Sequence, residues 1–346
     1  MERATMKLAT AILAAVLACV SQPLAAQDVP ALDENIAEPA MWRVSDADSE
    51  FILLGTFHIL PPSLQWRTDA LEAAIANADI VYFEVEADAP DAQAKTLNIL
   101  MTQGFNPPGT TLSSLLDDSD AAALSAISNE LGLPYAAIDP MRPWQAFLTL
   151  SVQFIVKQGF QPGAGVDSVL LAESRTLGKD VRFFETIEQQ LKLFTELDPD
   201  TEKSLLVITI RDWDEQREAF DDLYNAWRAG DAEFIDEQMN ATMREQAPLV
   251  YERLIIERNT AWADEIAAAM ESAPGKALVA VGAGHLVGDE HSVPALLKAR
   301  GFEVSRYGLD EPATEEAAND NQPPPSEDAA DDIGDLLEEL DETGRP

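Results

Sequence analysis

The segment FILLGTFH, residues 51–58, combines a strand-like run with a turn that ends in a histidine. Its first four residues form an apolar run typical of a buried strand, and the turn Gly-Thr-Phe-His follows directly. A second stretch of the same kind, ALVAVGAGH, covers residues 277–285. The whole chain contains only 3 histidines. Two of them, His58 and His285, therefore occupy the same GxxH setting after a strand, which predicts a shared role.

Each GxxH stretch opens a strand–helix–strand unit. A helix over 64–78 and the strand IVYFEVE (80–86) follow the first, and a helix over 293–299 and the strand FEVSRYG (302–308) follow the second. This order favours parallel strands with the connecting helix on one face of a sheet. The likeness predicts a weak internal duplication, and chance similarity between short strands is the alternative.

The rest of the chain completes an α/β pattern. MWRVSD (41–46) and the first GxxH stretch flank the turn-like ADSE, which predicts an N-terminal hairpin. One more strand, KDVRFFE, is expected at 179–185. Helices are expected at about 112–131, 143–158, 166–177, 187–197, 201–226 and, with breaks, 231–273. The predicted fold class is α/β, with a modest mixed sheet built from both ends of the chain and a large helical insertion.

Composition excludes several function classes. With 46% hydrophobic residues the chain can bury a sizeable core, in one large domain or two closely packed ones. Acidic residues outnumber Lys and Arg by 62 to 23, and the formal charge is −39. We therefore do not expect nucleic-acid binding, because a surface that binds phosphates needs clustered Lys and Arg side chains. Anionic membrane surfaces are disfavoured for the same reason.

The N-terminus has the pattern of a secretory signal peptide over residues 1–26. Two basic residues precede an apolar run, and small residues offer a cleavage site after Ala26. The expected protein is exported, to the periplasm or outside the cell. Cleavage before Cys19 with lipid attachment is the alternative. Cys19 is the 1 cysteine of the chain, so cleavage at Ala26 would exclude disulfides, thiol catalysis and Cys-ligated zinc. No later stretch is apolar enough to span a membrane.

The expected organisation beyond the signal peptide has three parts. A short linker (27–40) precedes the main domain (41–308), and an acidic tail (309–346) follows it. Residues 310–346 contain 14 acidic residues and one basic residue, too polar to fold alone. Within the tail, 333–342 has helical spacing and could dock a partner. A solvated, solubilising tail is the alternative interpretation.

The chemistry expected of the two histidines is metal binding. Sites in α/β sheets form where strands end, so His58 and His285 would converge if their strands are neighbours. Gly55 and Gly282 would allow the backbone to bend or to approach closely. Two imidazoles and a carboxylate form a common divalent-metal site. The alternative is that each histidine is structural.

Glu84 is the carboxylate expected to complete this site. It lies in an otherwise apolar strand, where a charge is costly unless it is paired, ligated or facing outward. Glu86 lies two residues further on and would share its face. Both would instead form a solvent-facing stripe if the strand were an edge strand.

Several separate motifs resemble one family. LLGTFHILPPSLQW, VYFEVEAD, GVDSVLLAESRTLGKDVRFFETIEQQL, AWRAGD, ERNTAWADEI and VAVGAGHLVGDEHSVPALLKARGFEVSRYG are similar, in order and spacing, to the TraB/PrgY/GumN family, and most closely to its GumN-like bacterial branch. The resemblance covers about residues 41–308. It implies the fold of the animal TIKI proteins, which are metal-dependent proteases with two GxxH motifs and a glutamate.

The resemblance implies a role for particular residues. His58, Glu84 and His285 match the metal ligands, and Gly55 and Gly282 match the motif glycines. Arg258 and Asn259 match the family's RN and are suited to holding a carboxylate or an oxyanion near the metal. Glu185 matches a further acidic position with a structural or supporting role, and Asp167 fits a helix N-terminus equally well. His291 departs from the family's usual GDxG and is expected at the surface.

The expected function is metal-assisted hydrolysis, and the resemblance implies that its target is an amide bond in an exported peptide or protein. Manganese, cobalt or zinc would activate water, with Glu84 or Glu86 as the alternative general base. One rival is a regulatory protein that binds a peptide or another ligand without cutting it. Another is an accessory factor for exopolysaccharide production, which would call for aromatic stacking platforms among the six tryptophans.

Overall fold

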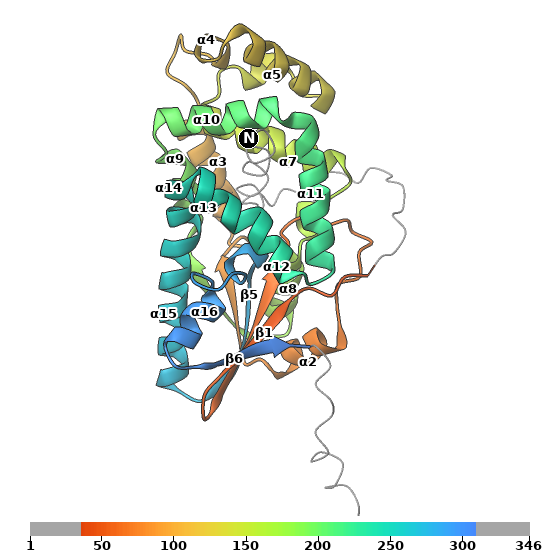
Figure 1. The fold of residues 1–346 in the computed structure, drawn as a ribbon, viewed down its shortest axis with the longest axis vertical. Coiled ribbons are helices and arrows are strands. Elements are labelled where there is room, and N and C mark those ends of the chain that lie inside the picture. Colours follow the sequence, from red (N-terminus) through yellow and green to blue (C-terminus); the bar gives the residue numbers. More distant parts are fainter. Residues whose placement is uncertain (1–35, 309–346) are drawn as a thin grey trace, which may run out of the picture. The chain divides into compact units, whose positions relative to one another are not determined.

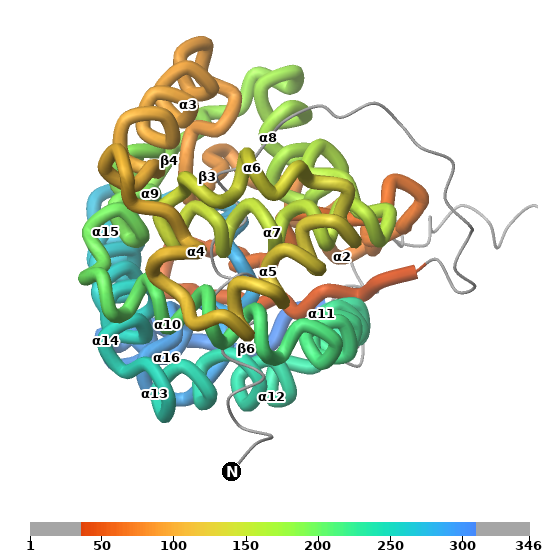
Figure 2. Tube along the Cα trace, turned by 90° about the horizontal axis from the view of Figure 1, so that it is seen from above, coloured from red at the N-terminus to blue at the C-terminus, as the bar shows by residue number. Residues whose placement is uncertain are grey.

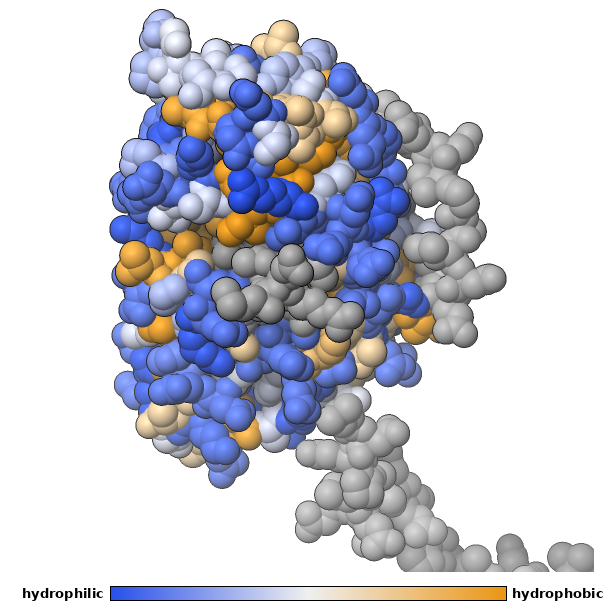
Figure 3. Space-filling view, turned by 45° about the horizontal axis from the view of Figure 1, so that its top comes forward, coloured by the Kyte–Doolittle hydropathy of each residue, from blue (hydrophilic) through white to orange (hydrophobic). Residues whose placement is uncertain are grey.

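The described part of the chain, residues 36–308 of a computed structural model, has the expected α/β fold. The expected signal peptide, residues 27–35 of the linker and the acidic tail with its helix at 333–342 lie outside the described residues. Within residues 36–308, no helix is long and apolar enough to cross a membrane. The face seen in Figure 3 is mostly hydrophilic where it is coloured, with smaller apolar areas between.

Six strands form one mixed sheet in the order β4-β3-β5-β2-β1-β6 (Figure 1). The strands are β1 (Met41–Ser45), β2 (Ser49–Thr56), β3 (Ile80–Val85), β4 (Asp180–Glu185), β5 (Gly275–Gly282) and β6 (Glu303–Tyr307). The antiparallel pairing of β1 with β2 confirms the expected hairpin. β5 pairs in parallel with both β2 and β3, and β3 pairs in parallel with β4. The sheet is therefore built from both ends of the chain.

The two strand–helix–strand units interleave. In the first, α2 (Asp69–Asn77) connects β2 to β3, and β5 lies between these two strands. In the second, α16 (Val293–Ala299) connects β5 to β6, with β2 and β1 between them. The units step in opposite directions along the sheet, so right-handed crossovers place their helices on opposite faces. Accordingly α2 packs on β5, whereas α16 packs on β1 and β6 (Figure 1).

The helices largely follow the expected segments. They are α3 (Ala92–Gln103), α4 (Leu112–Leu115), α5 (Asp118–Leu131), α6 (Tyr135–Ile138), α7 (Pro143–Lys157), α8 (Val166–Thr176), α9 (Ile187–Thr195), α10 (Pro199–Arg211), α11 (Trp213–Arg228), α12 (Ala232–Ile235), α13 (Thr242–Gln246), α14 (Pro248–Tyr251) and α15 (Glu257–Ser272). Short 3₁₀ helices η2 (Pro162–Ala164) and η5 (Ala283–His285) and π-helices η3 (Asp236–Ala241) and η4 (Glu252–Ile256) join them.

The helices differ from the sequence-based expectation in several places: α6 was not expected, and the expected helix over 201–226 is divided at Asp212 into α10 and α11. α2 begins after Thr68 rather than at Leu64, because the Thr68 side chain accepts a hydrogen bond from the amide of Leu71 and caps the helix there. α3 was not expected at all. Of its side chains only Ala92 and Ile99 are buried, so it has little apolar periodicity to reveal it.

The helical insertion packs over the carboxyl end of β2. Phe57, just beyond that strand, contacts the rings of Phe220, Tyr224 and Trp227 on α11, at centroid distances of 5.5–5.9 Å. α7 is apolar on most sides and is enclosed by α5 and α10 (Figure 2). This arrangement encloses the loops that follow the strands, where the histidines lie.

Candidate active site

Two histidines and a glutamate meet at the carboxyl ends of β2, β5 and β3. Thr56 at the end of β2 pairs with Gly282 at the end of β5, so both GxxH turns begin at the same level. The Nε2 atoms of His58 and His285 lie 4.0 and 3.9 Å from Oε1 of Glu84. All three side chains are buried. The structure thus brings together the three residues expected as metal ligands.

Glu84 is held from three directions. The amide of Gly282 donates to its Oε1 at 2.7 Å. Gln190 of α9 and Arg258 of α15 donate to its Oε2 at 3.1 and 2.7 Å. The carboxylate is only 2% exposed, so Glu84 is not part of a solvent-facing stripe.

Glu86 lies outside this cluster. The strand alternation that would place it beside Glu84 ends at Val85, the last residue of β3. The Glu86 side chain is 47% exposed and accepts a hydrogen bond from Arg175 at 2.6 Å. The structure therefore does not bring Glu86 to the histidines.

Arg258 is the buried cation of the cluster. Its Nη2 donates to Glu84 at 2.7 Å and its Nε to Oε1 of Glu185 at 2.8 Å. Its guanidinium also lies 4.7 Å from the ring centre of Trp262. Burial lowers the pKa of Arg258, but the two carboxylates outweigh it and hold the pKa above its ordinary value. Arg258 therefore remains charged despite its burial.

Asn259 and Arg258 determine which nitrogen of His285 carries the proton. The Nδ2 group of Asn259 donates to the carbonyls of His285 and His291, at 3.2 and 2.8 Å. Its Oδ1 is left to accept from Nδ1 of His285 at 2.6 Å. Arg258 Nη1 lies 3.0 Å from the other ring nitrogen, Nε2, and donates to it. His285 is therefore neutral, with its proton on Nδ1.

The pKa of His285 agrees with this neutral form. Burial lowers the pKa well below 6.5, and the positive charges of Arg258 and His58 lower it further. The third histidine, His291, contributes its carbonyl to Asn259, while its side chain is 29% exposed and lies outside the cluster.

His58 has a carboxylate partner instead. Asp167, in the first turn of α8, lies 2.7 Å from its Nδ1, and the hydroxyl of Thr56 donates to the same carboxylate at 2.8 Å. Burial lowers the pKa of His58, but the charge and hydrogen bond of Asp167 outweigh it and raise the pKa to about 8. Nε2 of His58 is buried and has no hydrogen-bond partner among the described residues.

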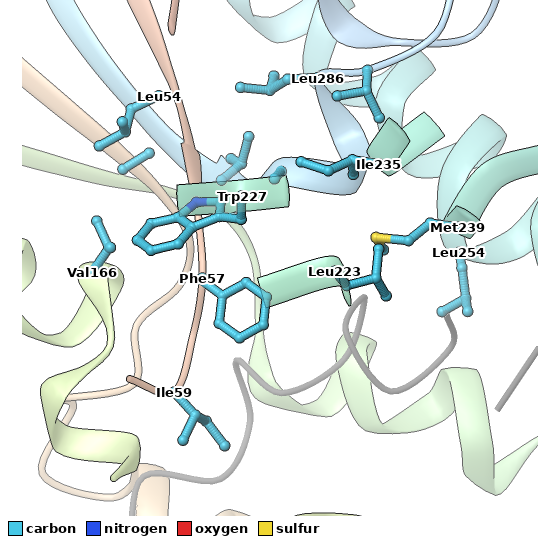
Figure 4. Packing of buried hydrophobic residues seen from close by; sticks show 14 of the residues in the cluster. Leu54, Phe57, Ile59, Val166, Leu223, Trp227, Ile235, Met239, Leu254 and Leu286 are labelled. Atoms are coloured by element: carbon cyan, nitrogen blue, oxygen red, sulfur yellow. The ribbon is translucent and has the colours of Figure 1, made fainter. Parts of the chain in front are cut away.

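The two motif glycines have different spatial roles. A Cβ on Gly282 would lie 3.0 Å from Nε2 of His58 and 3.2 Å from Oε1 of Glu84, so this glycine keeps the centre of the cluster open. A Cβ on Gly55 would instead approach Ala283 at 3.2 Å. The carbonyl of Gly55 accepts a hydrogen bond from the indole of Trp227 at 2.9 Å, and Figure 4 shows this ring beside Phe57.

Several supporting residues were not expected from the sequence. Gln190, Thr56 and Trp227 hold Glu84, Asp167 and the first GxxH turn, respectively. Thr56 lies inside the GxxH motif, so its position offered a signal. Gln190 and Trp227 lie in two of the motifs that resemble the family, FFETIEQQL and AWRAGD, but neither motif indicates their role. Their contacts are found only from the tertiary structure.

The donor set matches a divalent-ion site in residue type, two imidazoles and a carboxylate. Both imidazoles have Nδ1 engaged by an acceptor, so in the neutral form of each ring Nε2 carries the lone pair, as in metal-bound histidines whose other ring nitrogen is hydrogen-bonded. The separations of 3.9 and 4.0 Å exceed the roughly 3.4 Å expected between tetrahedral ligands with bonds of about 2.1 Å. Within residues 36–308, no three side chains already meet the geometry of a metal site. Binding an ion through His285 would also compete with its hydrogen bond to Arg258.

Comparison with known proteins identifies the family. The chain is 26% identical over 260 residues to the uncharacterized protein YbaP of Escherichia coli (strain K12), covering 75% of this chain and 92% of the relative. The YbaP protein of Shigella flexneri is also 26% identical, over 246 residues that cover 71% of this chain and 87% of the relative. The family model of the TraB/PrgY/gumN family matches residues 40–306. The match includes both GxxH turns, Glu84 and the Arg258–Asn259 pair, and this chain therefore belongs to the TraB/PrgY/gumN family.

Proposed function

We propose that this chain is an exported hydrolase of amide bonds in peptides or proteins, with a divalent ion held by His58, Glu84 and His285. Manganese, cobalt and zinc are the candidates. The observation that carries the proposal is the convergence of two imidazole Nε2 atoms on one buried carboxylate oxygen, with both rings fixed from behind. A divalent ion in such a site supplies activation of water, because it lowers the pKa of water from about 15.7 to about 7.

The protein's own residues would prepare the site. Asp167 and Asn259 hold the two imidazoles, and the Gly282 amide holds the carboxylate of Glu84. Arg258 keeps a positive charge beside them and has N–H groups suited to a substrate carbonyl as negative charge develops on its oxygen. In metal-free protein, His58 is also the group with a pKa of about 8 that could hold and return a proton at Nε2.

The second candidate is a protein that binds a peptide without cleaving it. One observation favours it: Arg258 already donates to His285 and Glu84, so the centre of the cluster is neutralised by a side chain. The third alternative is an exopolysaccharide accessory factor, and the tryptophans do not support it. All six are buried, at 0–9% exposure, so none offers an open stacking surface.

The test is the metal content of residues 27–346, measured by elemental analysis after reconstitution with manganese, cobalt or zinc. We expect near-stoichiometric metal in the wild type and its loss in the double variant His58→Ala/His285→Ala. His291→Ala is the matched control, because it removes a histidine outside the cluster and should keep the metal. Circular dichroism would check the folding of each variant.

A peptide-library cleavage screen with the metal-loaded protein follows. Cleavage that requires both histidines would support the hydrolase. Metal-free protein under all three conditions, with peptide retained but uncut, would overturn the hydrolase and leave the binding protein.

A further inference from the structure

A cavity of about 270 Å³ lies at the carboxyl ends of β3 and β4. Glu185 lines it and is hydrogen-bonded to Arg258, which in turn contacts Glu84. Its apolar part is formed by Val85, Ala92 and Ile187, which belong to a small hydrophobic cluster separate from the main core. The beginnings of α3 and α9 supply its walls. The carboxyl ends of parallel strands are the usual place for binding sites in α/β proteins.

The charged residues around this cavity are mainly acidic. Glu86, Asp91, Glu185 and Glu188 line it together with one ammonium, that of Lys95. Two of these carboxylates already have a guanidinium partner, Glu86 in Arg175 and Glu185 in Arg258. Nζ of Lys95 lies 3.1 Å from a carboxylate oxygen of Asp91 and 3.5 Å from one of Glu188, so it partly neutralises these two carboxylates. The cavity therefore offers carboxylates around an apolar base, which suits a ligand with an apolar stem and a cationic end.

Glu185 connects the cavity to the cluster and has an unused acceptor. Its Oε1 accepts from Nε of Arg258 at 2.8 Å, whereas its Oε2 is buried and has no hydrogen-bond partner among the described residues. The side chain is 11% exposed. A buried carboxylate oxygen without a donor is costly, and a bound cationic group would satisfy it.

We propose that this cavity receives the lysine or arginine side chain of a peptide substrate. The term substrate depends on the proposed hydrolase, whereas binding of a basic side chain does not. The volume lies just below the roughly 300–1,000 Å³ typical of whole small-molecule sites, which suits a single side chain. Through Glu185 and Arg258, the basic residue would be held next to Glu84, and the neighbouring peptide bond would be brought toward the cluster.

The test uses simple probes and needs no catalysis. N-acetyl-lysinamide and N-acetyl-argininamide would be titrated into 15N-labelled residues 27–346 and followed by NMR, with N-acetyl-norleucinamide as the uncharged probe. We expect shifts at residues lining the cavity, such as Ala89 and Ile187, with the basic probes. The norleucine derivative should bind at least about fivefold more weakly, and salt should weaken the basic probes.

Two sets of variants should change the affinity for the basic probes in opposite directions. Asp91→Asn/Glu188→Gln removes two exposed carboxylates and should weaken binding of N-acetyl-lysinamide about five- to tenfold. Lys95→Met removes the competing ammonium and should strengthen it several-fold. Glu196→Gln is the matched control, because it neutralises a carboxylate that follows the same helix, α9, outside the cavity, and should change nothing.

The outcomes separate this proposal from the proposed function. Equal binding of the norleucine and lysine derivatives, or shifts that avoid the cavity, would overturn the basic-side-chain site even if peptides are cleaved. Cavity binding with the expected responses to the variants supports it even if no peptide is cleaved, in which case only the hydrolase fails. In a library that is cleaved, enrichment of Lys or Arg at one position, lost in Asp91→Asn/Glu188→Gln, is the further expected result.

Discussion

The two GxxH turns share a motif but differ in their surroundings. Each follows a parallel strand, and each presents Nε2 toward Glu84 at about the same distance. His58 is paired with the carboxylate of Asp167, whereas His285 lies between a neutral amide and a guanidinium. Their pKa values consequently shift in opposite directions.

The difference shows what a short motif can and cannot specify. The strand and the turn place an imidazole at the sheet end. The protonation state of that imidazole depends on residues from other helices. These are Asp167 of α8 for His58, and Arg258 and Asn259 of α15 for His285. One ring can therefore be protonated near neutral pH while the other stays neutral, although the local sequences are alike.

The largest expected effect comes from removing the guanidinium that distinguishes the second turn. Arg258→Ala leaves Glu84 and Glu185 buried without their cation, so we expect the free energy of unfolding to fall by about 3–5 kcal/mol. The loss of a nearby positive charge should also raise the pKa of His285. Urea denaturation measures the first effect, and histidine NMR titration measures the second.

Arg300→Ala is the matched control for this variant. It breaks an exposed ion pair with Asp264 and should cost no more than about 1 kcal/mol. A loss below 1 kcal/mol in Arg258→Ala would show that the buried carboxylates do not depend on this cation.

The next prediction removes the partner that distinguishes the first turn. In metal-free Asp167→Asn, we expect the pKa of His58 to fall from about 8, because burial is then opposed by the charge of Glu84 without that of Asp167. In the wild type the pKa of folded His58 is above its ordinary value. The associated stability, about 2 kcal/mol, is complete below pH 6.5 and is lost as the pH rises through 8.

Stability measured from pH 6 to 9 should therefore show this loss in the wild type and a smaller loss in Asp167→Asn. Titration of the His58 ring by NMR gives the pKa directly. An unchanged pKa in the variant would mean that Asp167 does not set the protonation of His58.

A smaller effect should distinguish the two motif glycines. Gly282→Ala and Gly55→Ala each add a methyl group in a tight space, and each should cost about 1 kcal/mol of unfolding free energy. Only the methyl on Gly282 lies between His58 and Glu84. Metal affinity, measured by isothermal titration calorimetry, should therefore fall at least about tenfold in Gly282→Ala and little in Gly55→Ala. Equal losses would place the ion elsewhere.

The smallest effect is expected from Glu86→Gln. This side chain is half exposed and pairs only with surface groups, so stability should change by less than about 0.5 kcal/mol. Under the proposed function, metal content should stay at the wild-type level in Glu86→Gln, whereas Glu84→Gln should lose the metal. Loss of activity in Glu86→Gln with metal retained would restore Glu86 as the general base.

Much of the fold could be predicted from the sequence. Apolar strand runs and helical periodicity indicated the hairpin, all six strands and most helices, and the repeated GxxH with Glu84 indicated one site. It did not reveal α3, which buries few side chains, and strand alternation misplaced Glu86, because the strand ends one residue before it. Periodicity reports burial, and it carries no information where burial is slight or a strand stops.

The strand order and the partners of the histidines depend on contacts between distant segments and could not be predicted from the sequence. Asp167 lies 109 residues from His58 in the chain, and Arg258 lies 174 residues from Glu84. That Oε2 of Glu185 is buried without a hydrogen-bond partner among the described residues could likewise be seen only in the folded structure. The physical reason is that local sequence sets dihedral preferences and apolar faces, whereas hydrogen-bond partners, desolvation and pKa values depend on which distant segments meet in space.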